Sequence, residues 1–386
     1  MKENYRYKKY GMTISIALLV IVIGVVGFIY IHRSEQSSGD SNTADVAAAA
    51  ALANLDDDVD WSTLPTQTIE LTNDGLSVTE PGTYILSGNT TGNITVDTDG
   101  YVRLALDGVS INSSTGSALQ IDNAKKTVIQ LVNDSENSIR DGATRADESI
   151  DGAIYSSDDL VFEGEGKLTV EAQFADGIVS KDSLWIKSSD ITVTSVDDGI
   201  RGKDMLSISG GTISVNAQGD GLKSTNETDA GEGNLVISGG SVTIQSGDDG
   251  IKSEQKVWIT GGTINVAKSV EGIEAPVIII DGGDITVYAS DDGLNASASA
   301  ITTTGLSITI NSGTLAVTVG SGDTDAIDSN GDIIVNGGTI TITAPTSSFD
   351  FDGTGSINGG TVTVNGQTIT TMPTQMMGGG AMGGRR

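Results

Sequence analysis

Gly210-Gly211-Thr212-Ile213-Ser214-Val215 is the clearest copy of a motif that recurs along the chain: a glycine pair, a polar residue, then alternating apolar and polar residues. Further copies follow at intervals of 21 to 30 residues, beginning at Gly239, Gly261, Gly282, Ser312, Gly337 and Gly359. Degenerate copies begin at Glu165 and Ser188. A short apolar segment such as Leu206–Ile208 precedes each copy, and an Asp-Gly element follows most of them. Each repeat therefore predicts three short strands and three turns, which is one coil of a solenoid.

The alternation also predicts which side chains face the core. Ile213 and Val215 should point inward and stack on their counterparts in the next coil, while Thr212 points outward. Glycine should supply the left-handed or tight backbone at the corners. The repeats lack the 3.6-residue period of a helix, and a propeller blade needs about 40 residues. We therefore predict an all-β fold, a single-stranded right-handed parallel β-helix, the hand being the general preference of parallel crossovers.

The chain divides into six segments by composition. We expect a cytoplasmic basic segment over 1–11, a transmembrane signal-anchor helix over 12–31, an extracellular linker over 32–60, irregular coils with a cap over 61–150, the regular β-helix over 151–366 and a flexible Gly/Met tail over 367–386. Residues 12–31 are uncharged and mostly apolar, and four bases precede them, which predicts a single-pass cell-membrane protein with the β-helix outside the cell. A slowly cleaved signal peptide, giving a secreted protein, is the alternative.

Charge and composition exclude several classes of function. The 51 acidic and 21 basic residues give a formal net charge of −30, which repels nucleic acid. The chain has no cysteine, so disulfides, thiolate metal sites and thiol nucleophiles are excluded. Its one histidine, His32, adjoins the apolar segment and is no catalytic candidate.

The Asp-Gly elements carry the main chemical signal. Their acids keep step with the coils, at spacings of 21 to 29 residues, and should form one column: Asp176, Asp198, Asp220, Asp249, Glu271 and Asp292. Asp151 and Asp325 are candidates to extend it, and second acids stand at Asp197, Asp248 and Asp291. Coils about 4.8 Å apart lie at roughly twice the Ca²⁺–oxygen distance, so the six column acids and the three second acids are predicted to be calcium ligands. The alternative is turn chemistry alone, with the glycine at positive φ.

Basic residues and two tryptophans accompany the acids. Lys181, Arg201, Lys203, Lys223 and Lys252 follow column acids by three or five residues and are expected to bind an acidic sugar. Ion pairing within the chain and a role as general base in a lyase are the alternatives. Trp185 and Trp258 should face outward and stack on sugar rings, unless they only cover the sheet.

The sequence resembles a bacterial family of carbohydrate-binding-domain-containing proteins. The resemblance extends from Trp61 to Val364 and is most specific in segments 83–111, 151–170, 176–186, 197–204 and 219–224, which include DDGIRGKD and GDGLKS. It implies a pectate-lyase-like right-handed β-helix that binds calcium and plant-cell-wall polysaccharides, acidic ones such as polygalacturonate and also cellulose. It assigns calcium to Asp176, Asp197, Asp198, Asp220 and Asp249, whereas Glu271 departs from the repeated Asp.

The sequence is compatible with three functions. The first is a membrane-anchored, non-catalytic, calcium-binding protein that recognises acidic polysaccharides, with no catalytic residue assigned. The second is a polysaccharide lyase that uses Ca²⁺ and a Lys or Arg base. The third is a structural adhesin or stalk in which calcium only stiffens the rod.

Overall fold

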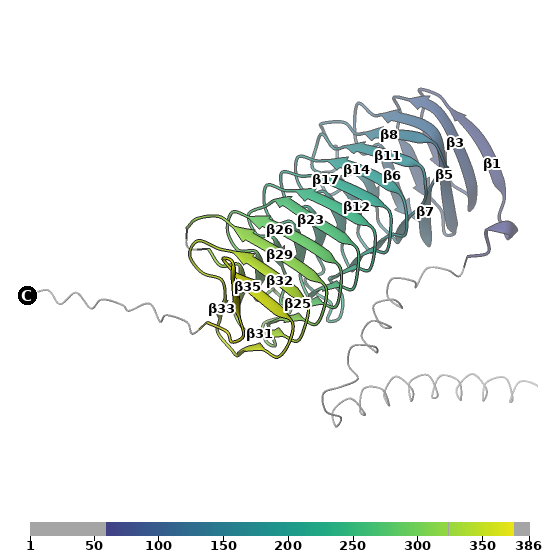
Figure 1. The fold of residues 1–386 in the computed structure, drawn as a ribbon. Helices are drawn as coiled ribbons and strands as arrows, with labels where there is room; N and C mark the ends of the chain where they lie inside the picture. Colours follow the sequence, from purple (N-terminus) through teal and green to yellow (C-terminus); the bar gives the residue numbers. More distant parts are fainter. Residues whose placement is uncertain (1–58, 323, 374–386) are drawn as a thin grey trace, which may run out of the picture. The chain divides into compact units, whose positions relative to one another are not determined.

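A computed structural model describes residues 59–322 and 324–373 of the chain. In this part the backbone winds in successive coils that stack along one axis, from β1 to β35 (Figure 1). Each regular coil contributes three short strands, and each strand pairs in parallel with its counterparts in the neighbouring coils. We call the three resulting rows ladder 1, ladder 2 and ladder 3. The prediction of three strands per coil is confirmed.

Ladder 1 is built from the Asp-Gly elements and their counterparts in the first coils, and contains β2 (Leu76–Val78), β4 (Ile94–Asp97), β6 (Leu119–Asn123), β9 (Gly152–Ser156), β12 (Asp176–Ser180), β15 (Ile200–Gly202), β18 (Leu222–Ser224), β21 (Ile251–Ser253), β24 (Ile273–Glu274), β27 (Leu294–Ala296), β30 (Ile327–Ser329) and β33 (Asp350–Phe351). Ladder 2 leads to the glycine pairs and contains β7 (Lys126–Leu131), β10 (Leu160–Gly164), β13 (Ser183–Ile186), β16 (Met205–Ile208), β19 (Asn234–Ile237), β22 (Lys256–Ile259), β25 (Val277–Ile280), β28 (Ser307–Ile310), β31 (Asp332–Val335) and β34 (Gly355–Ile357). Ladder 3 follows the glycine pairs and contains β8 (Glu136–Arg140), β11 (Lys167–Glu171), β14 (Asp190–Thr194), β17 (Thr212–Asn216), β20 (Ser241–Gln245), β23 (Thr263–Lys268), β26 (Asp284–Ala289), β29 (Thr314–Val319), β32 (Thr339–Thr343) and β35 (Thr361–Val364).

Longer strands open the stack and a short one closes it. The 3-10 turn η1 (Trp61–Thr63) precedes β1 (Thr66–Leu71), β3 (Gly82–Thr90) and β5 (Tyr101–Asn112). Because β5 pairs with both β7 and β8, ladders 2 and 3 join into one 24-stranded sheet, and ladder 1 is a separate 12-stranded sheet. At the other end, β36 (Gln367–Ile369) folds back antiparallel on β35.

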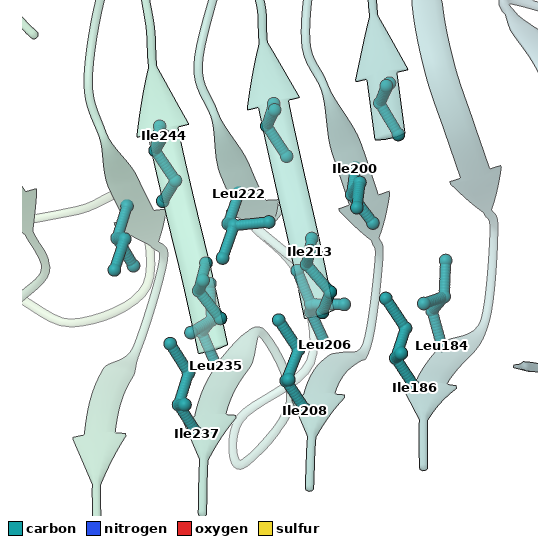
Figure 2. Packing of buried hydrophobic residues seen from close by; sticks show 14 of the residues in the cluster. Leu184, Ile186, Ile200, Leu206, Ile208, Ile213, Leu222, Leu235, Ile237 and Ile244 are labelled. Carbon is teal, nitrogen blue, oxygen red and sulfur yellow. The ribbon is translucent and has the colours of Figure 1, made fainter. Parts of the chain in front are cut away.

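The core is a set of aliphatic columns inside the coil. Leu206 and Ile208 lie in register with Leu235 and Ile237 of the next coil, and all four are fully buried (Figure 2). Side chains from the ladders meet in the interior, where each stacks on a residue of similar shape one coil away. Thr212, by contrast, is exposed, which confirms the predicted alternation.

Glycine has two different roles in the coils. In the glycine pair the second residue takes the left-handed φ that was expected, for example +88° at Gly211. In the Asp-Gly element Gly199 does not have a left-handed φ. A β-carbon there would lie 2.5 Å from the carbonyl oxygen of Gly221 in the next coil and 2.3 Å from Val215. The Asp-Gly element therefore needs glycine for close approach between coils, so a turn with positive φ does not explain it.

The predicted fold class needs one correction. It included a transmembrane helix, but in residues 59–322 and 324–373 no helix is long and apolar enough to cross a membrane. The helical structure described there is the three-residue turn η1. The segment 12–31 that was predicted to form the helix lies outside the described residues. The fold is an all-β stack of parallel strands, and its right hand stays a prediction.

Ser189 provides a test of the glycine-pair geometry. It stands in register with Gly211 but has φ 141°, and its buried hydroxyl has no hydrogen-bond partner in the described chain. A positive φ at a non-glycine residue costs about 1–3 kcal/mol. Ser189→Gly should therefore raise the free energy of unfolding by about 1 kcal/mol, after the added entropy of the unfolded chain is subtracted. Urea denaturation measures the change.

Ser209→Gly is the matched control. Ser209 stands directly before a glycine pair, but its own φ is not left-handed. This substitution should lower the free energy of unfolding by about a few tenths of a kcal/mol or more, because glycine increases the conformational entropy of the unfolded chain. If the two substitutions destabilise the protein equally, the backbone of Ser189 is not strained.

Candidate binding site

The acids of the Asp-Gly elements form one column, as their spacing predicts. Each stands two residues before the inward aliphatic residue of its ladder 1 strand, and these aliphatic residues pair in register from coil to coil. We call this set the acid column; its members are Asp176, Asp198, Asp220, Asp249, Glu271, Asp292 and Asp325. Parallel stacking therefore places like charges directly over one another along ladder 1.

Backbone amides donate to one oxygen of three buried aspartates in the column. Oδ1 of Asp176 accepts a hydrogen bond from the amide of Asp198 at 3.0 Å, and Oδ1 of Asp198 accepts from the amide of Asp220 at 2.9 Å. The same contact joins Asp220 to the amide of Asp249 at 2.9 Å. Each carboxylate thus fastens its coil to the next coil, which gives the repeated aspartate a structural role in addition to any ligand role.

A second column stands beside the first, one residue after each inward aliphatic residue. We call it the outer column; from β15 to β33 its members are Arg201, Lys223, Lys252, Glu274, Asn295, Asp328 and Asp350. Its first three members are basic and the others are acidic or amide residues. The charge of the outer column therefore reverses between β21 and β24.

The basic members bridge acids of neighbouring coils. Nζ of Lys223 lies 3.0 Å from Oδ2 of Asp198 and 2.7 Å from Oδ2 of Asp220. An Nη of Arg201 lies 2.6 Å from Oδ2 of Asp176 and also contacts Asp151. The alternative of pairing within the chain is thus observed at these positions, while the side chains keep 17% (Arg201) and 24% (Lys223) of their surface exposed.

Three other basic positions differ from one another. Lys252 bridges Asp249, at 2.7 Å, and Glu274, and 29% of its side chain is exposed. Lys181 pairs with Asp151 at 3.1 Å. Lys203 is 3.6 Å from its chain neighbour Asp204. Lys203 and Lys181 therefore show no ion pair with the acid column, because the register places Gly152, and not the predicted extension Asp151, opposite Asp176.

Beyond β21 the two columns face each other without a Lys or Arg in the outer column. Nδ2 of Asn295 donates to Oε2 of Glu271 at 3.0 Å, and the hydroxyl of Ser297 donates to Oε1 of Glu274 at 2.7 Å. Asn295 is only 9% exposed, yet its Oδ1 has no hydrogen-bond partner among the described residues. The counterparts of Asn295 in the two neighbouring coils are the acids Glu274 and Asp328. A buried acceptor without a partner in an acidic row calls for an explanation.

Two sets of carboxylates are close enough to share a cation. Oxygens of Asp220, Asp248 and Asp249 lie within 4.8 Å of one another, and so do oxygens of Asp249, Glu271 and Glu274. The remaining predicted ligands belong to no such group of three within the described residues: Asp176, Asp197, Asp198, Asp291 and Asp292.

Burial governs the protonation of these acids. It raises the pKa of Asp176 to about 7, and the nearby Arg201 only partly offsets this. Burial, followed by the charge of Glu274, raises the pKa of Glu271 to about 7. Burial and three neighbouring acids raise the pKa of Asp328 to about 7 as well. Negative charge is therefore costly along ladder 1. We call the part from Glu271 to β33, which includes Asp328, the acidic end; a nearby positive charge would stabilise the ionised acids there.

The two tryptophans do not lie as predicted. Trp185 and Trp258 project from ladder 2 away from the main core, but each is only 5% exposed. Nε1 of Trp258 donates to Oδ2 of Asp281 at 2.8 Å, and Ile279 is the counterpart of Trp258 in the next coil. The expectation of two open stacking faces is wrong because neighbouring side chains cover the indoles.

Sequence analysis missed Glu274, Asn295 and Asp328. They stand three residues after a column acid, the position that Arg201 and Lys223 hold in earlier coils. The position three residues after the column acid, read in every repeat and not only where it holds a base, identifies these three residues.

Comparison with known proteins supports the motif resemblance. The family model described as carbohydrate-binding domain-containing protein matches residues 72–323. A carbohydrate-binding domain-containing protein of Acetivibrio thermocellus is 36% identical over 135 residues, which are 31% of this chain and 47% of that protein. The chain thus matches about half the length of this relative. A solved structure described as the polysaccharide lyase-like protein from C. thermocellum, gadolinium derivative, has a TM-score of 0.48 at 28% identity, covering 57% of this chain and 92% of that one.

The pKa of Asp176 predicts how stability varies with pH. Its folded-state pKa of about 7 lies above the ordinary 3.8, so the native state holds a proton that unfolding releases between these values. This contribution to stability is present below pH 4 and is lost as the pH rises to about 7. Asp176→Asn, which keeps the acceptor for the amide of Asp198, should make the fall in melting temperature between pH 4 and 7 shallower. An unchanged slope would show that Asp176 is ionised throughout.

Proposed function

Because the chain belongs to the family of carbohydrate-binding domain-containing proteins, we propose that it binds acidic polysaccharides such as polygalacturonate, with calcium at the acid column and without cleaving them. The observation that carries the proposal is the pair of columns on ladder 1, where basic and then acidic side chains of the outer column follow one another along consecutive coils. A polysaccharide chain also extends in one direction, so it suits a row of groups repeated about every 4.8 Å.

The net charge of the protein explains why an acidic polysaccharide would need both the basic side chains and the bound calcium. A protein of charge −30 repels a polyanion, so an acidic polysaccharide must meet local positive charge. Arg201, Lys223 and Lys252 form a partly exposed basic row in three successive coils. Their ion pairs with the acid column hold them in place, but the same ion pairs cancel much of their charge. Cations bound at the acidic end would supply the additional positive charge that a polyanion requires.

The residues at the acidic end fit calcium. Asp249, Glu271 and Glu274 offer carboxylate oxygens within 4.8 Å of one another, and Asn295 adds a buried amide oxygen with no hydrogen-bond partner among the described side chains. Lys252 already bridges Asp249 and Glu274, so calcium would have to replace its ammonium group at these two acids. Oxygen-only donors of this kind suit a hard cation. When bound, calcium would supply the positive charge that links these groups to the carboxylates of a uronate chain. In the earlier coils the outer column offers Arg201 and Lys223 and no oxygen ligand, so those coils fit calcium less well.

The protonation of the lysines supports binding without cleavage. A base that removes a proton from the substrate has to be unprotonated at the working pH. Burial lowers the pKa of Lys223, but the ion pairs with Asp198 and Asp220 outweigh burial and hold this pKa above its ordinary value. The ion pairs of Lys252 act in the same direction. Both side chains therefore stay charged, which suits them to hold a carboxylate and not to abstract a proton.

Calcium binding is tested with Glu271→Gln/Glu274→Gln. Removing two carboxylates should lower the affinity for calcium about tenfold or more, measured by isothermal titration calorimetry. Glu136→Gln/Glu171→Gln on exposed positions of ladder 3 makes the same change in net charge and should leave the affinity unchanged. Equal affinities for the two double variants would contradict calcium binding at the acidic end.

Affinity electrophoresis in polygalacturonate tests the polysaccharide class. Retardation should be strong in calcium, should weaken about tenfold in EDTA, and should not occur in a neutral soluble cellulose derivative. The same mixtures should show no rise in the absorbance of unsaturated uronides. Retardation that EDTA does not change would contradict the role of calcium, and accumulating unsaturated uronides would show that the protein is a lyase.

A further inference from the structure

The loop between β8 and β9 ends at Asp151, whose carboxylate meets two of the bases. The register of ladder 1 places Gly152 opposite Asp176, so Asp151 is not a further member of the acid column. Nζ of Lys181 lies 3.2 Å from Oδ1 of Asp151 and 3.1 Å from Oδ2. An Nη of Arg201 contacts the same Oδ2. We call Asp151, Lys181 and Arg201 the Asp151 cluster.

One buried arginine holds the backbone on both sides of Asp151. Nε of Arg145 donates to the carbonyl oxygen of Ile150 at 2.8 Å, and an Nη donates to that of Gly152 at 3.2 Å. Arg145 also pairs with Asp141, and both of these side chains are buried. Because a buried ion pair is costly to break, the loop keeps Asp151 in one place beside the two bases.

The pairing of Arg201 within this cluster is incomplete. Asp151 and Asp176 both contact the same Nη nitrogen, whereas the buried Nε has no hydrogen-bond partner among the described residues. An arginine binds a carboxylate most strongly through two parallel N–H···O bonds. Since the two internal acids leave the Nε–H unused, a carboxylate that replaced Asp151 could bind Arg201 more completely than Asp151 does.

The contacts of Asp151 show which chemical group the two bases accept. All three side chains of the cluster are partly exposed, so a carboxylate from solution can reach the bases where Asp151 now lies. Arg201 is also the first member of the basic row, and Lys223 and Lys252 follow it in the next two coils. A carboxylate bound at Arg201 would therefore extend the contact that a polyanion makes with this row.

We propose that Lys181 and Arg201 form a subsite for one uronate carboxylate, and that Asp151 occupies this subsite as an internal competitor in the free protein. The choice of a uronate rests on the proposed function, whereas the choice of a carboxylate rests on the contacts of Asp151. A competitor on the same chain acts at a high effective concentration. Asp151 therefore lowers the affinity for the polysaccharide, because the subsite is open only when Asp151 is displaced.

Affinity electrophoresis in polygalacturonate, at low ionic strength and in EDTA, tests the subsite. Asp151→Asn removes the competing charge and should tighten binding about tenfold, because the two bases can then hold the polysaccharide. Asp151→Ser should give the same gain and takes the place of Asp151→Asn if thermal melts show that the latter does not fold. Glu148→Gln makes the same change in net charge at an exposed position of the same loop and should leave the affinity unchanged.

Lys181→Gln separates the subsite from a general effect of the loop, since adding it to Asp151→Asn should remove most of the gain. The proposal would be overturned by a gain that survives Lys181→Gln, by an equal gain in Glu148→Gln, or by retardation of Asp151→Asn no stronger than that of the wild type. The wild-type protein in calcium tests the proposed function, whereas the ratio of variant to wild type in EDTA tests the subsite, so either can fail alone.

Discussion

Parallel stacking in register is the constraint on which the rest of the structure depends. Each residue of a coil lies over its counterpart in the next, so Leu206 stacks on Leu235 and Ile208 on Ile237 (Figure 2). The same rule that aligns aliphatic side chains inside the coil aligns charges outside it. A repeated aspartate therefore becomes a column of negative charge, and the protein must stabilise that column with the groups nearby.

The column is stabilised in different ways along its length. At Asp198 and Asp220, backbone amides bind one carboxylate oxygen and Lys223 binds the other. Towards the other end the outer column carries Glu274 and Asn295 in place of bases, and the amide oxygen of Asn295 has no hydrogen-bond partner within the described chain. The column thus has a self-neutralised half and an acidic half. The proposal gives the first half a role in structure and sugar contact and the second half the binding of calcium.

Much of the fold could be predicted from the sequence, because the glycine pair and the alternation of Ile213 and Val215 are local signals with a fixed period. The stacking of Asp176 on Asp198 followed from the same period. The ion pairs were harder to predict, since they depend on side chains reaching across coils. The cover over Trp185 was missed because burial of an outward side chain depends on neighbours in other coils.

A crystal grown in calcium, with anomalous diffraction to locate the ions, tests the central claim most directly. The account predicts anomalous density among Glu271, Glu274 and Asn295, and none between Asp198 and Asp220, where Lys223 already lies. Ions bound along the whole column with Lys223 displaced, or no ion at Glu271 and Glu274, would contradict the division of the column into a self-neutralised half and a calcium-binding half.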